Sequence, residues 1–186
     1  MLEETDSIEK LYELFPWKHP DAIKENRRIS EKAAQYTGKP VGEWPEFEIM
    51  WDFSPDRQHY CLDGETPDTI KAQFPNGFAV GYTSLAQLDE KLHRGSKRTN
   101  DEIWNIGCKS KLAKCIVHWQ EGNLMTPVII RAFKDEIHIA GGNHRLAIAR
   151  ARNIEKVPFY VCPKDISKVE AILKSVTWNR GINEHG

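Results

Sequence analysis

The segment from Pro127 to Arg152 constrains the fold of this chain more than any other part of the sequence. Residues 127–133 are mostly apolar and β-branched after a leading proline, residues 134–136 are typical of a tight turn, and residues 137–140 return as a second strand. Two glycines follow directly, and the residues after them carry their apolar side chains at helical spacing. A hairpin that runs without a linker into a helix predicts an α/β fold, of the α+β type, around a small sheet.

The same reasoning predicts further helices and strands. Capping residues followed by apolar residues at helical spacing predict helices at residues 6–15, 20–36, 84–92, 110–119 and 165–176. Apolar residues predict strands at 47–53, where they alternate with more polar ones, and at 157–162. The Pro, Gly and Asp content of residues 54–75 predicts loops with one helical turn after Pro67. We therefore expect a small mixed sheet with surrounding helices.

The size and composition of the chain allow one ordinary globular unit. It has 186 residues, of which 40% are hydrophobic and 28% charged, so a core can form. We expect an N-terminal helical and strand extension, residues 1–99, packed on a core of residues 100–186. The longest apolar stretches, about five residues, are far shorter than the roughly 20 that a membrane span needs. Because the N-terminus lacks the features of a secretory signal, we expect a cytoplasmic protein with no membrane partner.

The four cysteines, at positions 61, 108, 115 and 162, form no Cys-x-x-Cys pair. They are too sparse for a disulfide framework in a chain that can build its own core, so we expect free thiols. His59 and Cys61 have the spacing of half a zinc site, but a second pair of ligands is missing. The sequence therefore leaves the metal ligands unknown.

Charge is distributed unevenly along the chain. The formal net charge is −1, but residues 1–60 hold 13 acidic and 8 basic residues, whereas residues 101–186 hold 9 acidic and 13 basic ones. The acidic N-terminal region would suit a protein partner, and the basic half would suit phosphates. Arg94, Lys97 and Arg98 lie in one basic loop and are candidates for DNA contact. The alternative is that this loop is only solvated.

The turn between the hairpin and the following helix has the features of an anion site. Its two glycines permit positive φ and the close approach of a ligand, and the free amides at the helix start carry the positive end of the helix dipole. The neighbouring His and Arg could add charge-assisted donors to a phosphate. We predict phosphate binding by Gly141, Gly142, Asn143, His144 and Arg145. The alternative is that the glycines only allow tight packing and that Arg145 pairs with a nearby carboxylate.

Two stretches, Lys111–Arg131 and Ile139–Val161, follow a pattern of helix, Pro-led strand, hairpin, glycine turn with His-Arg, helix and Val-Pro strand. In order and spacing this pattern resembles the ParB/sulfiredoxin superfamily over residues 108–162. The resemblance implies a small α/β fold in which the glycine turn and the next helix hold the phosphates of ATP or another nucleotide. Sulfiredoxins supply a further phosphate-binding lysine in the region that corresponds here to Lys109, Ser110 and Lys111.

Individual branches of the superfamily differ from this chain at informative positions. Sulfiredoxins carry their nucleophilic cysteine where this chain has Asn143, which cannot form a thiolate, so sulfinic acid reduction is not expected. The free-serine kinase branch carries an Asp in the place of Gly141. Partition ParB proteins continue into a helix-turn-helix domain, whereas 24 residues follow Cys162 here. The branch that remains is that of stand-alone proteins of plasmids and phages, including fertility-inhibition proteins.

For that branch the resemblance implies nucleotide hydrolysis and, in some members, DNA cleavage, in conflict between mobile elements. Phosphoryl transfer needs charge neutralisation and a group that orients the attacking water. His144 is the first candidate because the reference pKa of histidine is near neutrality, and we expect it to act together with Arg145. His118 and His138 are further candidates.

Acidic residues in the same half would be needed if Mg²⁺ accompanies the nucleotide. The candidates are Asp101, Glu102, Glu121, Asp135 and Glu136, and the sequence does not choose among them. Two other functions stay open. One is a phosphotransferase that acts on a small metabolite or on modified phage DNA bases, and the other is a non-catalytic inhibitor that binds a protein through the acidic N-terminal region.

Overall fold

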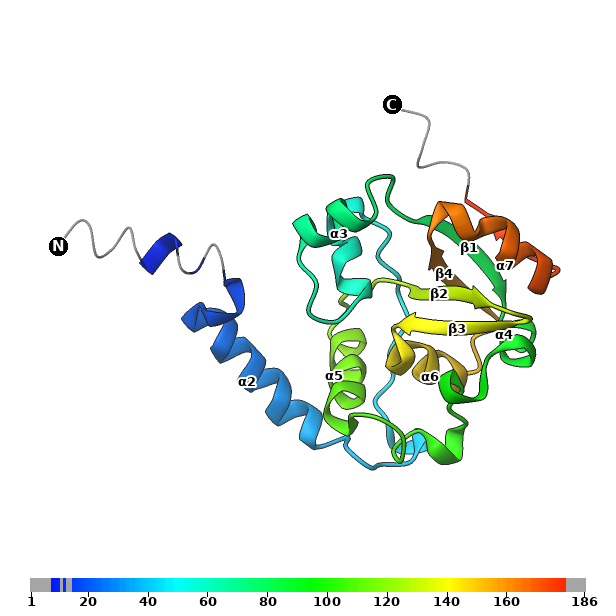
Figure 1. The fold of residues 1–186 in the computed structure, drawn as a ribbon. Coiled ribbons are helices and arrows are strands. Elements are labelled where there is room, and N and C mark those ends of the chain that lie inside the picture. Colours follow the sequence, from blue (N-terminus) through cyan, green and yellow to red (C-terminus); the bar gives the residue numbers. More distant parts are fainter. Residues whose placement is uncertain (1–7, 11, 13–14, 180–186) are drawn as a thin grey trace.

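The computed structural model of this chain describes residues 8–10, 12 and 15–179 (Figure 1). Within these residues one sheet has the strand order β3-β2-β4-β1-β5. The strands are β1 (Ala79–Ser84), β2 (Val128–Phe133), β3 (Glu136–Gly141), β4 (Lys156–Val161) and β5 (Thr177–Trp178). β2 and β4 pair in parallel, and the other neighbours are antiparallel. The α/β fold with a small mixed sheet is therefore confirmed.

Helices pack around this sheet, except for α2 (Pro20–Ala34), which packs on α5 (Lys109–Gln120). The others are α3 (Pro67–Gln73), α4 (Leu85–Lys91), α6 (Asn143–Ala151) and α7 (Ile166–Ile172). Short 3-10 turns are η1 (Pro16–Lys18), η2 (Val41–Glu43), η3 (Pro55–Cys61), η4 (Arg94–Ser96), η5 (Asn100–Glu102) and η6 (Pro163–Asp165). The helix predicted at residues 6–15 lies partly outside the described residues. Among the described helices, none is both long enough and apolar enough to cross a membrane.

Alternate residues of the central strands face two different layers. Val128 and Ile130 of β2 are buried with apolar side chains of α4, α6 and α7. Ile129, between them, packs instead with Cys61 of η3 and Ile70 of α3. This is the period of two expected of a strand that is buried on both faces. The core therefore lies on both sides of the central strands.

The strand predicted at residues 47–53 is wrong. Phe47, Ile49 and Trp51 pack against the core, as their alternation indicates. However, the segment pairs with another part of the chain only through a bridge between Trp51 and Met125 within the described residues. An alternating pattern reports which side chains face the core, but a strand also needs a ladder of backbone hydrogen bonds. The segment is an extended coil that covers the core.

β1 occupies a stretch for which the sequence analysis predicts no element. It lies between β4 and β5 and is antiparallel to both. Gly81 is required by close packing, because a Cβ at this position would lie 2.4 Å from the Phe159 ring. The sheet thus extends across the boundary expected at residue 99, since β1 joins the strands that follow that residue.

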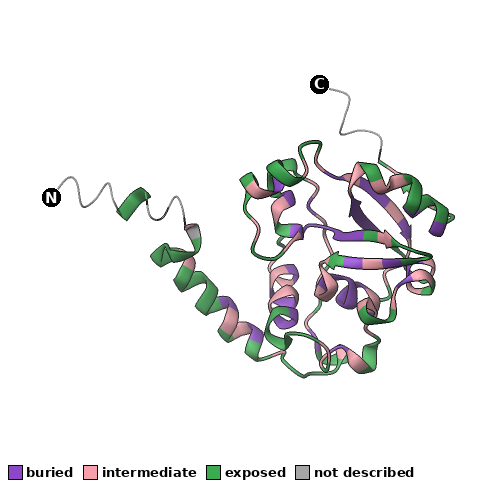
Figure 2. Ribbon diagram, viewed as in Figure 1, coloured by how far each residue is buried: buried purple, intermediate pink, exposed green. Residues whose placement is uncertain are grey.

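α2 packs along α5 and lies at the edge of the molecule, away from the sheet (Figure 1). Ile29 and Ala33 of α2 are buried against Ala113 and Val117 of α5. Most of its remaining residues are exposed, as Figure 2 shows. α2 therefore contacts α5 through the buried residues of one face.

An ion-pair cluster reinforces the contact between these two helices. Glu121, directly after α5, lies 2.6 Å from Arg28 and 3.0 Å from Lys32 of α2. Hydrogen bonds from these two cations lower the pKa of Glu121 to about 2. Glu121, one of the candidate Mg²⁺ ligands, is therefore already neutralised within the fold.

Candidate functional site

The glycine turn between β3 and α6 depends on both of its glycines. Gly142 precedes the first residue of α6 with φ of 90°, in the left-handed region that favours glycine. Gly141 is needed for a different reason, because a Cβ there would lie 2.1 Å from the carbonyl oxygen of Cys61. The backbone of η3 thus packs directly on the turn. Tight packing explains Gly141, and the start of the helix explains Gly142.

A cleft of about 940 Å³ lies beside this turn. Its walls come from α2, α5, the end of η3, the segment before β2 and the start of α6. The cleft-lining residues that the sequence predicts as site residues are Arg98, Lys111, Gly141, Gly142, Asn143, His144 and Arg145. Basic side chains (Arg57, Arg98, Lys111, Lys114 and Arg145) outnumber acidic ones (Glu25, Asp52 and Asp63). The charge of the cleft therefore favours an anion.

Three buried polar atoms at this cleft have no hydrogen-bond partner within the described residues. They are Oδ1 of Asn143, Nε2 of His144 and Nη1 of Arg98. Buried polar atoms in native proteins are nearly always paired with protein, water or a ligand. Arg98 offers a charged donor, and the Asn amide and His ring can each present a donor or an acceptor. These three atoms are therefore available to a polar ligand at the cleft, with Arg98 as the charged donor for an anion.

Arg145 does not take the role predicted for it. Its side chain is buried, with 5% of the residue exposed. Nη1 donates to the carbonyl and the hydroxyl of Thr126, and Nη2 donates to the carbonyls of Cys61 (3.3 Å) and Tyr60 (3.4 Å). The guanidinium therefore joins two backbone segments, residues 60–61 and Thr126, at the cleft. It is a positioning residue, and its donors are used by the protein rather than offered to a phosphate.

His144 is neutral in this environment. Burial, and next the positive charge of Arg98, lower its pKa to about 4, while Asp63 acts in the opposite direction. The ring is therefore uncharged at pH 7 and presents Nε2 without a partner among the described residues. A neutral imidazole can accept a hydrogen bond or a proton from water, whereas an imidazolium cannot. This is the state that the predicted water-orienting role requires.

The predicted lysine-containing site at the start of α5 is only partly at the cleft. Lys111 lines it and donates to Asp63 at 2.5 Å, and this contact raises the pKa of Lys111. Lys109 and Ser110 lie outside the cleft, and the hydroxyl of Ser110 contacts Sγ of Cys108. Successive helical residues point in different directions, so only one of the three can face the ligand.

The three basic residues of the loop predicted to contact DNA have different surroundings in the structure. Arg94 is paired with Glu102, and Lys97 donates to the carbonyl of Asp89 at 3.3 Å. Arg98 instead points into the cleft, where Gly107 leaves room for it, since a Cβ there would lie 2.6 Å from Nη2. The loop is therefore not a free basic patch. Arg98 belongs with the anion site, which the sequence alone did not indicate.

The acidic residues at the cleft differ from the Mg²⁺ candidates named from the sequence. Asp52 and Asp63 line it, and both come from the segment between residues 51 and 75 that the sequence analysis treats as loop or strand end. Asp52 is buried and paired with Arg57 at 3.2 Å, whereas Asp63 is exposed. Asp101, Asp135 and the other candidates lie outside the cleft. The sequence offered no signal for Asp63, because its position depends on how the loop folds back.

The remaining histidines and cysteines do not all lie at the cleft. His118 lines the cleft, and burial lowers its pKa, but His138 does not line it. Cys61 is buried with its pKa raised to about 12 by burial, and the four cysteines are free thiols, as predicted. His59 and Cys61 form no metal-ligand group with a third residue of the described chain.

Comparison with known proteins gives no relative: no protein-family model, no curated protein and no solved structure matches this chain. The resemblance to the ParB/sulfiredoxin superfamily is therefore an expectation from the motifs alone. The functional argument depends on the cleft and on the chemistry of the residues that line it.

Proposed function

We propose that the cleft binds a nucleotide, ATP in the first instance, and that the protein hydrolyses it as a stand-alone member of the ParB/sulfiredoxin superfamily. One observation carries the proposal: Arg98, Asn143 and His144, each with an unpartnered buried atom, line the same cleft as the left-handed Gly142. The proposed setting, conflict between plasmids or phages, depends on the motif resemblance alone.

The phosphates would lie against the start of α6. The amides there are oriented by the helix and carry the positive end of its dipole. Arg98 and Lys111 supply positive charge from two other parts of the chain, so the phosphates would be neutralised from several sides. Tyr60 and Leu124, which are 57% and 50% exposed at the cleft, offer an apolar surface for a base.

A magnesium ion would suit this arrangement. In nucleotide sites Mg²⁺ is held by one or two carboxylates together with the phosphates of the substrate. Asp63 has an exposed carboxylate at the cleft that is paired with Lys111 at 2.5 Å. It would hold the ion by exchanging this partner, which would leave Lys111 free for the phosphates. When bound, the ion would neutralise charge that develops on the phosphates.

Hydrolysis would use His144 to orient water. Because its pKa is about 4, the ring is neutral and its Nε2 atom can accept a hydrogen bond from the attacking water. Phosphoryl transfer depends more on positioning and charge neutralisation than on a strong base. Arg145 contributes indirectly by holding the residues on either side of the cleft.

The binding proposal is tested by titrating purified protein with ATP. We expect Arg98→Met and Lys111→Met each to weaken ATP binding by roughly tenfold or more, since each removes a charged phosphate contact. Lys109→Met is the matched control, because Lys109 has the same charge near the start of α5 but lies outside the cleft. Equal affinity of all four proteins, or no binding by the wild type, would refute the nucleotide site.

Turnover distinguishes the proposed activity from its alternatives. The protein is incubated with γ-labelled ATP and Mg²⁺, with and without DNA. Free phosphate that His144→Ala abolishes supports hydrolysis, label on an acceptor supports a phosphotransferase, and binding without turnover supports a non-catalytic inhibitor. DNA cleavage has no support from the basic loop, because Arg94 and Lys97 have intramolecular partners. DNA binding that is equally strong at low and at moderate salt would argue against phosphate contacts by this loop.

A further inference from the structure

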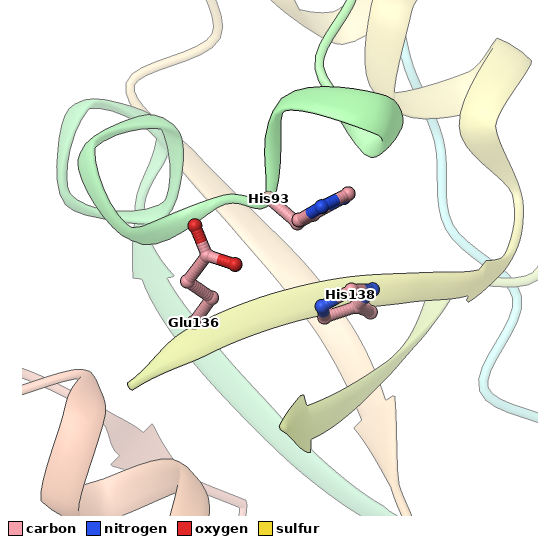
Figure 3. A group of neighbouring side chains, drawn as sticks. All are labelled: His93, Glu136 and His138. Carbon is pink, nitrogen blue, oxygen red and sulfur yellow. The ribbon is translucent and has the colours of Figure 1, made fainter. Parts of the chain in front are cut away.

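A second group of potential ligands lies outside the cleft, at the edge of the sheet. His93 comes just before η4, and Glu136 and His138 lie two residues apart on β3. One ligand atom of each residue lies within 4.8 Å of the others. Figure 3 shows the three side chains gathered in one place, between β3 and the start of η4.

The fold brings these residues together through backbone contacts. The amide of His93 donates to the carbonyl of Ile137 at 2.8 Å, and the amide of Ile139 donates to the hydroxyl of Ser96 at 3.1 Å. The segment that carries His93 therefore lies along β3. Glu136 and His138 share a face of β3 because they are two residues apart, and His93 faces them from the neighbouring segment.

Two of these side chains lack the partners that polar groups usually have. Nε2 of His138 is buried and has no hydrogen-bond partner within the described residues. The carboxylate of Glu136 is exposed and lies close to the two imidazoles, with no ion pair to any described residue. The imidazole rings of His93 and His138 are stacked, with centroids 4.3 Å apart. Stacking alone leaves the buried nitrogen of His138 unexplained.

We propose that His93, Glu136 and His138 bind a divalent transition-metal ion of the Zn²⁺ class. Two imidazoles and one carboxylate suit zinc, whereas Mg²⁺ and Ca²⁺ prefer oxygen ligands throughout. Three protein ligands leave one position of a tetrahedral ion for water. The site differs from the nucleotide cleft in its residues, and it does not depend on the function proposed for that cleft.

Binding requires a local rearrangement of the two imidazoles. Ligand atoms around a tetrahedral zinc ion lie roughly 3.3 Å apart, so the three residues must approach one another. The near-parallel rings must also tilt, because the lone pairs of both nitrogens have to point to one ion. Nδ1 of His93 accepts a hydrogen bond from the amide of Gly95 at 3.1 Å. Ligation through Nε2 moves the ring proton to Nδ1 and releases that amide, which can bond to water because Gly95 is exposed.

A bound ion would connect the sheet edge to the cleft. It would fix His93 to β3, and five residues later Arg98 enters the cleft. The backbone of Arg98 is already held by Arg150 of α6, whose Nη1 donates to its carbonyl at 2.7 Å. A bound ion would therefore order the segment that carries Arg98.

The test is zinc binding to the full chain after treatment with a chelator, without nucleotide, measured by calorimetry. We expect saturable binding of one Zn²⁺ per chain, weakened by at least about tenfold in His93→Gln, Glu136→Gln and His138→Gln. His59→Gln is the control and should bind like the wild type. Mg²⁺ in place of Zn²⁺ should give no saturable binding. The absence of zinc binding in the wild type overturns the proposal. It is also overturned if the three variants bind zinc with the same affinity as the wild type.

A second measurement covers variants that fail to fold. In an amide NMR spectrum of the wild type, zinc should shift the signal of Gly95 more than those of residues around His59, because metal ligation releases the Gly95 amide. Glu136 is exposed, so Glu136→Gln should keep the native spectrum and need at least about tenfold more zinc for the same shift. A Gly95 shift with the same zinc dependence in Glu136→Gln as in the wild type would also overturn the proposal.

Discussion

Arg145 illustrates how one residue can support a site without contacting its ligand. A buried guanidinium needs acceptors, and here the carbonyls of Tyr60, Cys61 and Thr126 provide them. These carbonyls belong to two segments far apart in sequence, so the side chain fixes their distance. Loss of the guanidinium would leave several buried carbonyls without a donor.

We therefore predict that Arg145→Met lowers the free energy of unfolding by at least about 2 kcal/mol. Urea denaturation followed by tryptophan fluorescence measures this change. Arg27→Met is the control, because Arg27 is exposed on α2 and should tolerate the change within about 0.5 kcal/mol. A fully stable Arg145→Met protein that loses only ATP binding would restore the phosphate-binding role.

His144 predicts a pH dependence of stability. Its pKa is 6.5 in the unfolded chain and about 4 in the folded protein, so the unfolded state binds more protons between these values. The contribution of His144 is fully present above pH 6.5 and is lost as the pH falls toward 4. We expect this loss to be on the order of 1 kcal/mol, because the side chain is only partly buried.

The measurement compares unfolding of the wild type and His144→Gln at several pH values from 4 to 7. The variant should lose less stability over this range than the wild type, since Gln does not titrate. Parallel curves for the two proteins would show that the pKa of His144 is not depressed.

At the scale of elements, the turn between β3 and α6 depends most on Gly141. A side chain at this position would meet the carbonyl of Cys61, which is backbone and cannot rotate away. We predict that Gly141→Ala destabilises the protein by about 1–3 kcal/mol or more. The control is Gly42→Ala, because a Cβ at Gly42 would have nothing within 4 Å. Thermal melting of both variants tests this, and equal midpoints would mean that η3 does not pack on the turn.

Elements with strong local signals could be predicted from the sequence. The hairpin, the glycine turn and α6 follow from β-branched runs, turn residues and helical spacing, all of which act within a few residues. The segment at 47–53 was misassigned because alternation identifies buried side chains and not hydrogen-bond partners. β1 was missed because it contains Gly81 and gains its partners from β4, which lies more than 70 residues further along the chain.

The site was only partly predictable for a related reason. Gly142, Asn143 and His144 are neighbours in sequence, so a local motif identifies them. Arg98 and Asp63 reach the cleft through loops whose course depends on contacts with other parts of the chain. The same motif identifies Arg145, but the sequence could not predict the hydrogen bonds of its side chain to distant carbonyls.

At the scale of the whole molecule, the pairing of strands in the sheet determines which parts of the chain must be present for folding. β1 lies between β4 and β5, so residues 100–186 alone would lack a strand from the interior of the sheet. We predict that a fragment of residues 100–186 shows no cooperative thermal transition. A fragment of residues 40–186, which lacks α2 but keeps β1, should melt cooperatively at a lower temperature than the full chain.

Calorimetry of the two fragments tests this expectation. The longer fragment loses the contact of Ile29 and Ala33 with α5, which explains its lower midpoint. Cooperative melting of residues 100–186 would mean that the C-terminal half folds independently of β1.

The position of β1 also determines when the protein can finish folding during synthesis. β1 leaves the ribosome early, but its main partner β4 ends at residue 161, so β1 remains an unpaired edge while about 70 further residues are translated. The hairpin of β2 and β3 needs no such delay, because its two strands are joined by a short turn. Nascent chains arrested before β4 emerges should therefore be the species most exposed to aggregation and most in need of a chaperone.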